Sequence, residues 1–163
     1  MGQANATIRT AAIGDEVTIA DLQIAVWDRA LGPVMAGLIP RDQIRSKWHS
    51  WVHEPESPDH QVLAAEHNDE IVGFVALAPG GEIVAMEISP DHRGEGFAGQ
   101  LIDEVVELLH AEGEKQLHAW ALAGDDAREE FLANRGFAKD GVERTLEGPA
   151  DGVLEKRWTL PLY

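Results

Sequence analysis

A glycine-rich turn in the middle of the chain, Gly94-Glu95-Gly96-Phe97-Ala98-Gly99, has the composition of a phosphate-binding loop. The strand-like residues 82–89 precede it, Pro90 ends that run, and Arg93 leads into the glycines. An apolar-periodic helix begins directly after the turn. This order places backbone N–H groups and a helix N-terminus at one point, where they favour a negatively charged ligand. The sequence therefore predicts a site for a phosphorylated ligand at this turn.

The same turn also matches the dinucleotide fingerprint G-x-G-x-x-G, between a predicted strand and a helix. Three observations disfavour that interpretation. The motif follows several strands instead of opening a first βαβ unit, Asp125 lies too far along to be the expected acidic residue, and 163 residues are few for a two-halved dinucleotide fold. No Gly-Lys-Ser/Thr follows the glycines, which excludes a P-loop. An NAD-type oxidoreductase is kept only as a disfavoured alternative.

Two histidines, His49 and His53, lie one helical turn apart, a spacing that can hold a metal ion, and Glu54 is adjacent. The pattern offers no third ligand distant in the sequence, and the chain has no cysteine. We therefore expect no metal and favour histidines that line a substrate pocket or face solvent. For the tryptophans core packing is the default, with an apolar pocket as the alternative. These tryptophans are Trp27, Trp48, Trp51 and Trp120.

Hydrophobic periodicity and turn residues predict the elements that must position these groups, in the order β-α-α-β-β-β-α-β-α-β-β. Asp42 and Asp125 are expected to cap helices, and Gly32-Pro33 to interrupt the first one. The expected fold class is α/β, with a mixed, largely antiparallel central sheet flanked by helices. The expected strands are residues 7–12, 61–65, 71–78, 82–89, 115–122, one from 137 and 153–160. The expected helices are residues 16–31, one from Asp42 to Pro55, one from the glycine turn to Gly113, and residues 126–134.

Composition narrows the class of protein further. The length of 163 residues and 44% hydrophobic content fit one domain, expected over residues 7–163 after a disordered tail of residues 1–6. No run resembles a transmembrane helix or a signal peptide, and the absence of cysteine excludes disulfides and thiol nucleophiles, so a cytoplasmic protein is expected. A net charge of −16 disfavours nucleic acid and anionic membranes as partners and favours a cationic substrate such as an amine.

Framed from Arg93, the turn reads Arg-x-x-Gly96-x-Ala98, which resembles the acetyl-CoA signature of GNAT-type N-acetyltransferases. Residues 131–137 resemble the second motif of that family. Trp27 through residues 37–40, and the hairpin that starts at Asp140, resemble many bacterial members. The resemblance spans residues 7–163. It implies a GNAT-like fold, acetyl-CoA as co-substrate, and acetyl transfer to a primary amine of a small molecule or peptide, with a homodimer left open.

The resemblance also implies roles for particular residues. The backbone of residues 87–89 would pair with the pantetheine arm, an amide near Ile88 would stabilise the tetrahedral oxyanion, and the turn would hold the pyrophosphate. Asp125 and Phe131 would contact the cofactor from the following helix. The full expected cofactor-binding set is Glu87, Ile88, Ser89, Arg93, Gly94, Glu95, Gly96, Phe97, Ala98, Gly99, Asp125 and Phe131.

The expected base is Glu82, which opens the strand that leads to the turn, where some relatives carry a catalytic glutamate. Glu87 and His118 are the alternatives. On a regular strand Glu82 and Glu87 face opposite ways unless a bulge intervenes, as it often does in this family.

The chain departs from the family pattern at the residue that would act as the general acid. The tyrosine that often protonates the leaving thiolate would fall at Leu132, the only tyrosine is Tyr163, Asp125 replaces an asparagine, and Arg128 replaces a small residue. Direct attack of the amine on the thioester, without a covalent enzyme intermediate, is the expected mechanism. A non-catalytic acyl-CoA-binding or sensing module is the alternative that the missing tyrosine favours. The sequence does not identify the acceptor.

Overall fold

The computed structural model describes residues 5–37, 40–145 and 153–163, with side chains left undescribed over residues 30–37. The order of elements agrees with the order predicted from the sequence, apart from a short 3-10 turn before α3. The elements are β1 (Thr7–Thr10), α1 (Asp15–Gly37), α2 (Arg41–His53), β2 (Gln61–His67), β3 (Glu70–Ala78), β4 (Glu82–Ile88), η1 (Pro90–His92), α3 (Phe97–Ala111), β5 (Gln116–Leu122), α4 (Asp126–Asn134), β6 (Ala138–Thr145) and β7 (Leu154–Pro161).

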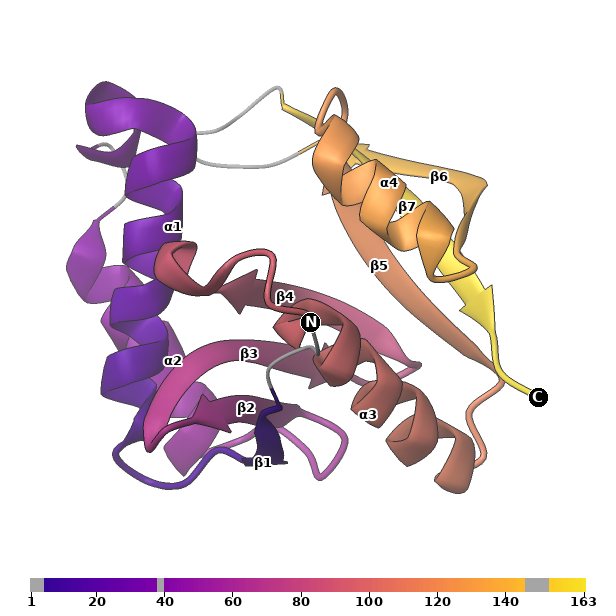
Figure 1. Cartoon of the computed structure of the whole chain (residues 1–163), viewed down its shortest axis with the longest axis horizontal. Helices are drawn as coiled ribbons and strands as arrows, with labels where there is room; N and C mark the ends of the chain where they lie inside the picture. Colours follow the sequence, from indigo (N-terminus) through magenta and orange to yellow (C-terminus); the bar gives the residue numbers. More distant parts are fainter. Residues whose placement is uncertain (1–4, 38–39, 146–152) are drawn as a thin grey trace.

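The strands form one sheet in the order β1-β2-β3-β4-β5-β7-β6, with α1 and α2 against one face and α3 and α4 against the other (Figure 1). Only the β4–β5 pair is parallel among the described strands. The predicted α/β class with a mixed, largely antiparallel sheet is confirmed. No helix in the described part of the chain is long and apolar enough to span a bilayer.

Strand alternation divides the buried side chains between two cores, one on each face of the sheet. On β2 and β3, Leu63 and Val75 pack with α3 and α4, whereas Val62 and Phe74 pack with α1 and α2. The central strands therefore carry apolar side chains on both faces, which explains why β3 reads as a nearly continuous hydrophobic run.

Two predicted helix boundaries change. The first helix was predicted to end near residue 31, but α1 continues through Gly32 and Pro33 to Gly37, because a proline removes one helical N–H donor while the bonds on either side persist. Asp42 was predicted to cap α2; it instead lies in the first turn, and Pro40 is the N-cap residue. Residues 38–39 of the Gly-Leu-Ile-Pro segment lie outside the described residues. The cap at Asp125 is confirmed, since its side chain accepts from the Arg128 N–H at 3.2 Å.

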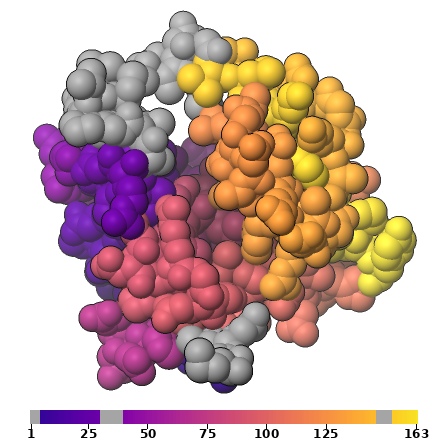
Figure 2. Space-filling view, turned by 45° about the horizontal axis from the view of Figure 1, so that its top comes forward, coloured from indigo at the N-terminus to yellow at the C-terminus, as the bar shows by residue number. Residues whose placement is uncertain are grey.

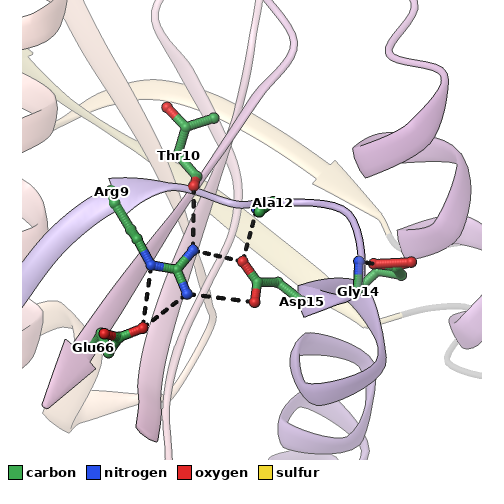
Figure 3. Close-up of polar contacts among 7 residues, drawn as sticks. Arg9, Thr10, Ala12, Gly14, Asp15 and Glu66 are labelled. Carbon is green, nitrogen blue, oxygen red and sulfur yellow. Dashed lines mark hydrogen bonds and ion pairs between the residues drawn. The ribbon is translucent and has the colours of Figure 1, made fainter. Parts of the chain in front are cut away.

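The start of α1 is attached to the sheet by an ion-pair chain (Figure 3). Arg9 on β1 donates to Glu66 on β2 at 2.9 Å and to Asp15 on α1 at 2.6 Å. Asn5 and Ala6 also make contacts, because the Ala6 N–H donates to Gln100 at 2.9 Å and the Asn5 carbonyl lies 2.8 Å from the His67 ring. Residues 1–4 of the expected tail lie outside the described residues.

A bulge in β4 changes which side chains share a face. The pairing with β3 shifts between Ala76 and Leu77, which leaves Val84 as the extra residue. Ile83 and Met86 consequently both enter the α3 core although they are three residues apart. By alternation on either side of the bulge, Glu82 and Glu87 then lie on the opposite face, the one that carries α1.

The two parallel strands, β4 and β5, separate almost at once. They share a single register pair, Glu82 with His118, beside a hydrogen bond from the His118 N–H to the Gly81 carbonyl at 2.7 Å. Beyond that point the two strands diverge, and α4 lies over the side where the gap between them widens (Figure 1). The splay leaves one edge of β4 without a strand partner from residue 83 onward.

Candidate active site

The glycine turn presents unpaired backbone donors. Gly94 and Gly96 have φ of 81° and 88°, in the left-handed region that glycine adopts at little cost. α3 begins at Phe97 without a side-chain cap. Within the described part of the chain, the N–H groups of residues 94–99 donate no hydrogen bond to another residue. Unpaired amides at the start of a 15-residue helix are able to bind an anion, and the phosphate site at this turn stays a prediction.

Side chains on both sides of the turn hold it in place. Phe97 is 1% exposed in the core, and the His92 ring lies 2.8 Å from the Glu95 carboxylate. Gly99 is buried, and a Cβ there would lie 1.8 Å from the Arg135 guanidinium, so this glycine serves close packing against the residue that ends α4. Arg93 and Gly94 are exposed, and a Cβ on Gly94 would meet nothing within 4 Å. The surface is recessed between the start of α3 and α4 (Figure 2).

The register of β3 and β4 determines which backbone groups of β4 face the opening. The Ser89 N–H donates to Val72 at 2.8 Å, so Ser89 and Glu87 occupy hydrogen-bonded positions opposite β3. Ile88 and Met86 alternate with them and direct their N–H and C=O groups toward β5. Of the three residues expected to pair with a pantetheine arm, the register leaves the Ile88 backbone for that role and adds Met86.

Arg128 occupies this opening. From the first turn of α4 it donates to the Trp120 carbonyl on β5 at 3.2 Å and to the Met86 carbonyl on β4 at 3.3 Å. Its guanidinium therefore bridges the two strands where they no longer pair. In the sequence, Arg128 stands out only because it replaces a small residue of the family pattern. A cation at that position was the signal that could have pointed to its place in the opening.

One helical turn after Arg128, Leu132 is 0% exposed in the core on the α3 side. Tyr163 is 98% exposed at the C-terminus. Neither residue offers a proton donor to the opening. Phe131 is half-buried, with the Arg135 guanidinium 6.0 Å from its ring centroid.

Glu82 lies at the closed end of the opening in a polar and aromatic setting. Its Oε1 accepts from the Trp120 indole N–H at 2.9 Å and lies 3.7 Å from Arg144. Arg144 stacks on the Trp120 ring at 3.9 Å and pairs with Glu155 at 2.8 Å. The carboxylate is thus oriented by groups from β5 and β6, and its side chain remains 35% exposed, accessible to a substrate.

Glu87 lies on the same face of β4 and is influenced by the charges of Arg128, Arg93 and Asp125. Burial raises the pKa of the Glu87 carboxyl and Asp125 adds to this, while the positive charges of Arg128 and Arg93 work against it. A raised pKa makes the carboxylate a stronger base, so Glu87 stays the alternative to Glu82.

His118, the third candidate, is tied into another network. Burial and the charge of Arg157 lower its pKa, against the carboxylates of Asp140 and Glu82, so the neutral ring is favoured. Its Nδ1 lies 2.8 Å from the Thr159 hydroxyl, which donates to Asp140 at 2.7 Å. These contacts indicate that His118 is a structural residue, held in place on β5 next to Glu82.

The other aromatic residues differ in whether they pack in the core or contact the candidate site. Trp48 is fully buried and donates to Gln23 at 2.8 Å, and Trp27 and Trp51 pack against the core under α1 and α2. Trp120 alone among the four tryptophans contacts Glu82. His49 and His53 lie beside Glu16, a neighbour that the sequence pattern did not reveal.

Comparison with known proteins places this geometry in a family. A family model for the acetyltransferase (GNAT) family matches residues 26–137. None of the curated proteins matches the chain in sequence.

Solved structures share the fold across nearly the whole chain. A GCN5-related N-acetyltransferase from Rhodopseudomonas palustris is 21% identical, with a TM-score of 0.74 and 99% of each chain covered. A ribosomal-protein-alanine N-acetyltransferase from Brucella melitensis is 19% identical, with a TM-score of 0.75 over 96% of this chain and 99% of that one. YncA from Salmonella typhimurium, solved with its cofactor acetyl-CoA, is 16% identical, with a TM-score of 0.72 over 98% and 95%.

Proposed function

Because the chain belongs to the acetyltransferase (GNAT) family, we propose that it transfers the acetyl group of acetyl-CoA directly to a primary amine of a small molecule or peptide. The observation that supports this most is the arrangement along β4. Glu82 lies at the closed end of the β4–β5 opening, the N–H groups of Met86 and Ile88 that have no strand partner follow, and the unpaired amides of the glycine turn lie beyond them. The proposed base, oxyanion donor and pyrophosphate site thus follow one another along β4 and the turn after it.

In this proposal each residue has a role that follows from its position along β4 and the glycine turn. The amides of residues 94–99, with Arg93, bind the pyrophosphate, and the Ile88 backbone pairs with the pantetheine arm. A strand rises about 3.3 Å per residue, so Met86 lies about 13 Å and Ile88 about 20 Å from Glu82. The Met86 N–H is the closer of the two gap-facing amides, and we assign it to the oxyanion. Glu82 takes the ammonium proton through a water molecule.

The leaving thiolate has no tyrosine to protonate it. A thiol has a pKa near ~8.5, so its thiolate leaves without a dedicated acid more readily than an alkoxide would. The Arg128 guanidinium, held in the opening, would stabilise the negative charge on sulfur without donating a proton. Asp125 and Phe131 remain proposed cofactor contacts from α4.

A non-catalytic acyl-CoA-binding module is the second candidate, and Leu132 at the tyrosine position is the observation that favours it. Two measurements separate the candidates. Calorimetric titration should show saturable binding of acetyl-CoA and none of NAD, and a panel of amines should show thiol release above the no-enzyme rate. Acetyl-CoA binding without release on any amine would favour the module, and NAD binding would favour the oxidoreductase. A cytoplasmic location and a homodimer stay predictions.

Reversing the charge of Arg93 should weaken donor binding. We expect Arg93→Glu to raise the KM for acetyl-CoA about tenfold or more, because an exposed cation beside the unpaired amides becomes an anion that repels phosphate. The effect should shrink at high salt. Steady-state kinetics with varied acetyl-CoA measure it, with Lys115→Glu, at the residue before β5, as the matched charge-reversal control. Equal KM values in the two variants would contradict the pyrophosphate assignment.

Removing the charge of Arg128 should lower turnover more than binding. We expect Arg128→Gln, which keeps a donor for the two strand carbonyls, to lower kcat about 10- to 100-fold with a smaller change in KM for acetyl-CoA. Arg128→Leu removes charge and hydrogen bonds together and serves as the comparison, with melting temperatures measured for both. Full kcat in Arg128→Gln would assign this residue to bridging the strands alone.

A further inference from the structure

A carboxylate and two imidazoles meet where the first turn of α1 contacts the last two turns of α2. Glu16 Oε1 lies 2.5 Å from His53 Nε2, and the His49 and His53 rings stack with centroids 4.0 Å apart. One ligand atom from each of the three residues lies within 4.8 Å of the others. The sequence pattern supplied the two histidines, and the fold supplies the third group from another helix.

Glu16 is held in place before any ligand arrives. It is 7% exposed, and its second oxygen, Oε2, accepts from the Gly14 N–H at 2.7 Å. The neighbouring Asp15 is anchored to Arg9 on the sheet (Figure 3). One oxygen is thus anchored while the other faces the histidines.

We propose that Glu16, His49 and His53 form a binding site for a divalent transition-metal ion of the Zn²⁺ class, which links α1 to α2. Two imidazoles and a carboxylate are a ligand set that Zn²⁺ and Co²⁺ accept, and histidines at i and i+4 converge on one ion. Metal–ligand bonds of about 2.0–2.2 Å separate tetrahedral ligand atoms by about 3.4 Å. When an ion binds, Glu16 Oε1 and His53 Nε2 therefore move slightly apart, and the His49 ring moves toward them.

The surroundings permit a partly open ion. A depression of about 300 Å³, lined by Glu16, Val17, Arg45, Ser46 and His49, adjoins the cluster and admits the waters that complete the coordination. Arg45 is the cation that faces this depression, and its charge is shared with Asp21 at 3.9 Å and Asp42 at 3.6 Å. The net charge of −16 favours cation binding overall.

The position of the cluster assigns the ion a structural role. Glu16 lies in the first turn of the helix that is attached to β1 and β2 at one side of the sheet, whereas the catalytic candidates lie between β4 and β5. An ion here would stabilise the packing of α1 on α2 without touching the substrates.

Metal-free protein, prepared with a chelator and desalted, is titrated with ZnCl₂ by calorimetry and with CoCl₂ by visible absorption. We expect one ion per chain, visible bands of a four- or five-coordinate Co²⁺, and a rise of about 5 °C or more in the melting temperature at ~100-fold excess over Kd. His49→Ala should weaken binding about tenfold or more.

His49 is exposed, so its alanine variant should fold normally, and His110→Ala on α3 is the matched control that should bind like the unaltered chain. Glu16→Gln tests the carboxylate. The absence of saturable binding, or binding that His49→Ala and His110→Ala change equally, would overturn the proposal. Because every readout is binding or stability, the outcome is independent of the acetyl-transfer activity.

Discussion

Replacement of Glu82 by glutamine is expected to lower kcat/KM for the amine about 10²- to 10³-fold at neutral pH. Glutamine keeps the shape of the side chain and an oxygen that can accept from the Trp120 indole N–H, but it cannot take a proton. The loss should narrow as the pH approaches ~10, because the substrate ammonium, with a pKa near ~10.4, then supplies the free amine unaided. Initial rates of thiol release across pH measure the effect.

The alternatives for the base are tested in the same assay. Glu87→Gln and His118→Asn should each cost less than Glu82→Gln, because Glu82 is oriented by Trp120 and accessible, whereas the His118 Nδ1 is engaged by Thr159. Glu70→Gln, at the exposed start of β3, is the matched control and should leave the rate unchanged. A Glu82→Gln variant with full activity at neutral pH would remove Glu82 from the role of base.

Gly81→Ala should cost about 2–5 kcal/mol in the free energy of unfolding. Gly81 has φ of 71°, and a Cβ there would lie 2.2 Å from the backbone oxygen of Gln116. The left-handed conformation costs a non-glycine residue about 1–2 kcal/mol, and the clash adds about 1–3 kcal/mol because a backbone atom, unlike a side-chain end, cannot easily move away. The strain falls at the junction where β4 and β5 meet.

The adjacent Gly80 is a matched control for this prediction. Its φ is 85°, but a Cβ there would meet nothing within 4 Å. Gly80→Ala should therefore cost only the conformational part, about 1–2 kcal/mol. Denaturant unfolding gives the free energy of unfolding of both variants, and the difference between them is the cost of the close approach to Gln116. Equal losses would mean that the junction relaxes without cost.

The features that the sequence predicted well are local. The glycine turn and the helix over residues 126–134 with its cap at Asp125 each depend on the dihedral preferences of a few neighbouring residues. The order of elements follows from hydrophobic period, which is also local. The acetyl-CoA signature lies within one such segment, so the family could be suspected before any contact was known.

The features that the sequence left open depend on pairing between distant segments. The two acidic residues of β4 share a face because the pairing with β3 leaves Val84 as a bulge, and a shift of one residue reverses every side chain beyond it. Arg128 reaches Met86 and Trp120 only because β4 and β5 diverge. Glu16 meets His53 only because α1 packs on α2.

The sequence by itself therefore predicted the type of site and its position on the chain: a glycine turn, proposed to bind phosphate, after a strand that carries Glu82. The tertiary structure decided which backbone groups of that strand stay unpaired, which cation lies in the opening, and which carboxylate joins the two histidines. The physical reason is the range of the interactions. Backbone dihedrals and helix caps are set within a few residues, whereas strand register and helix packing minimise the free energy of the whole fold.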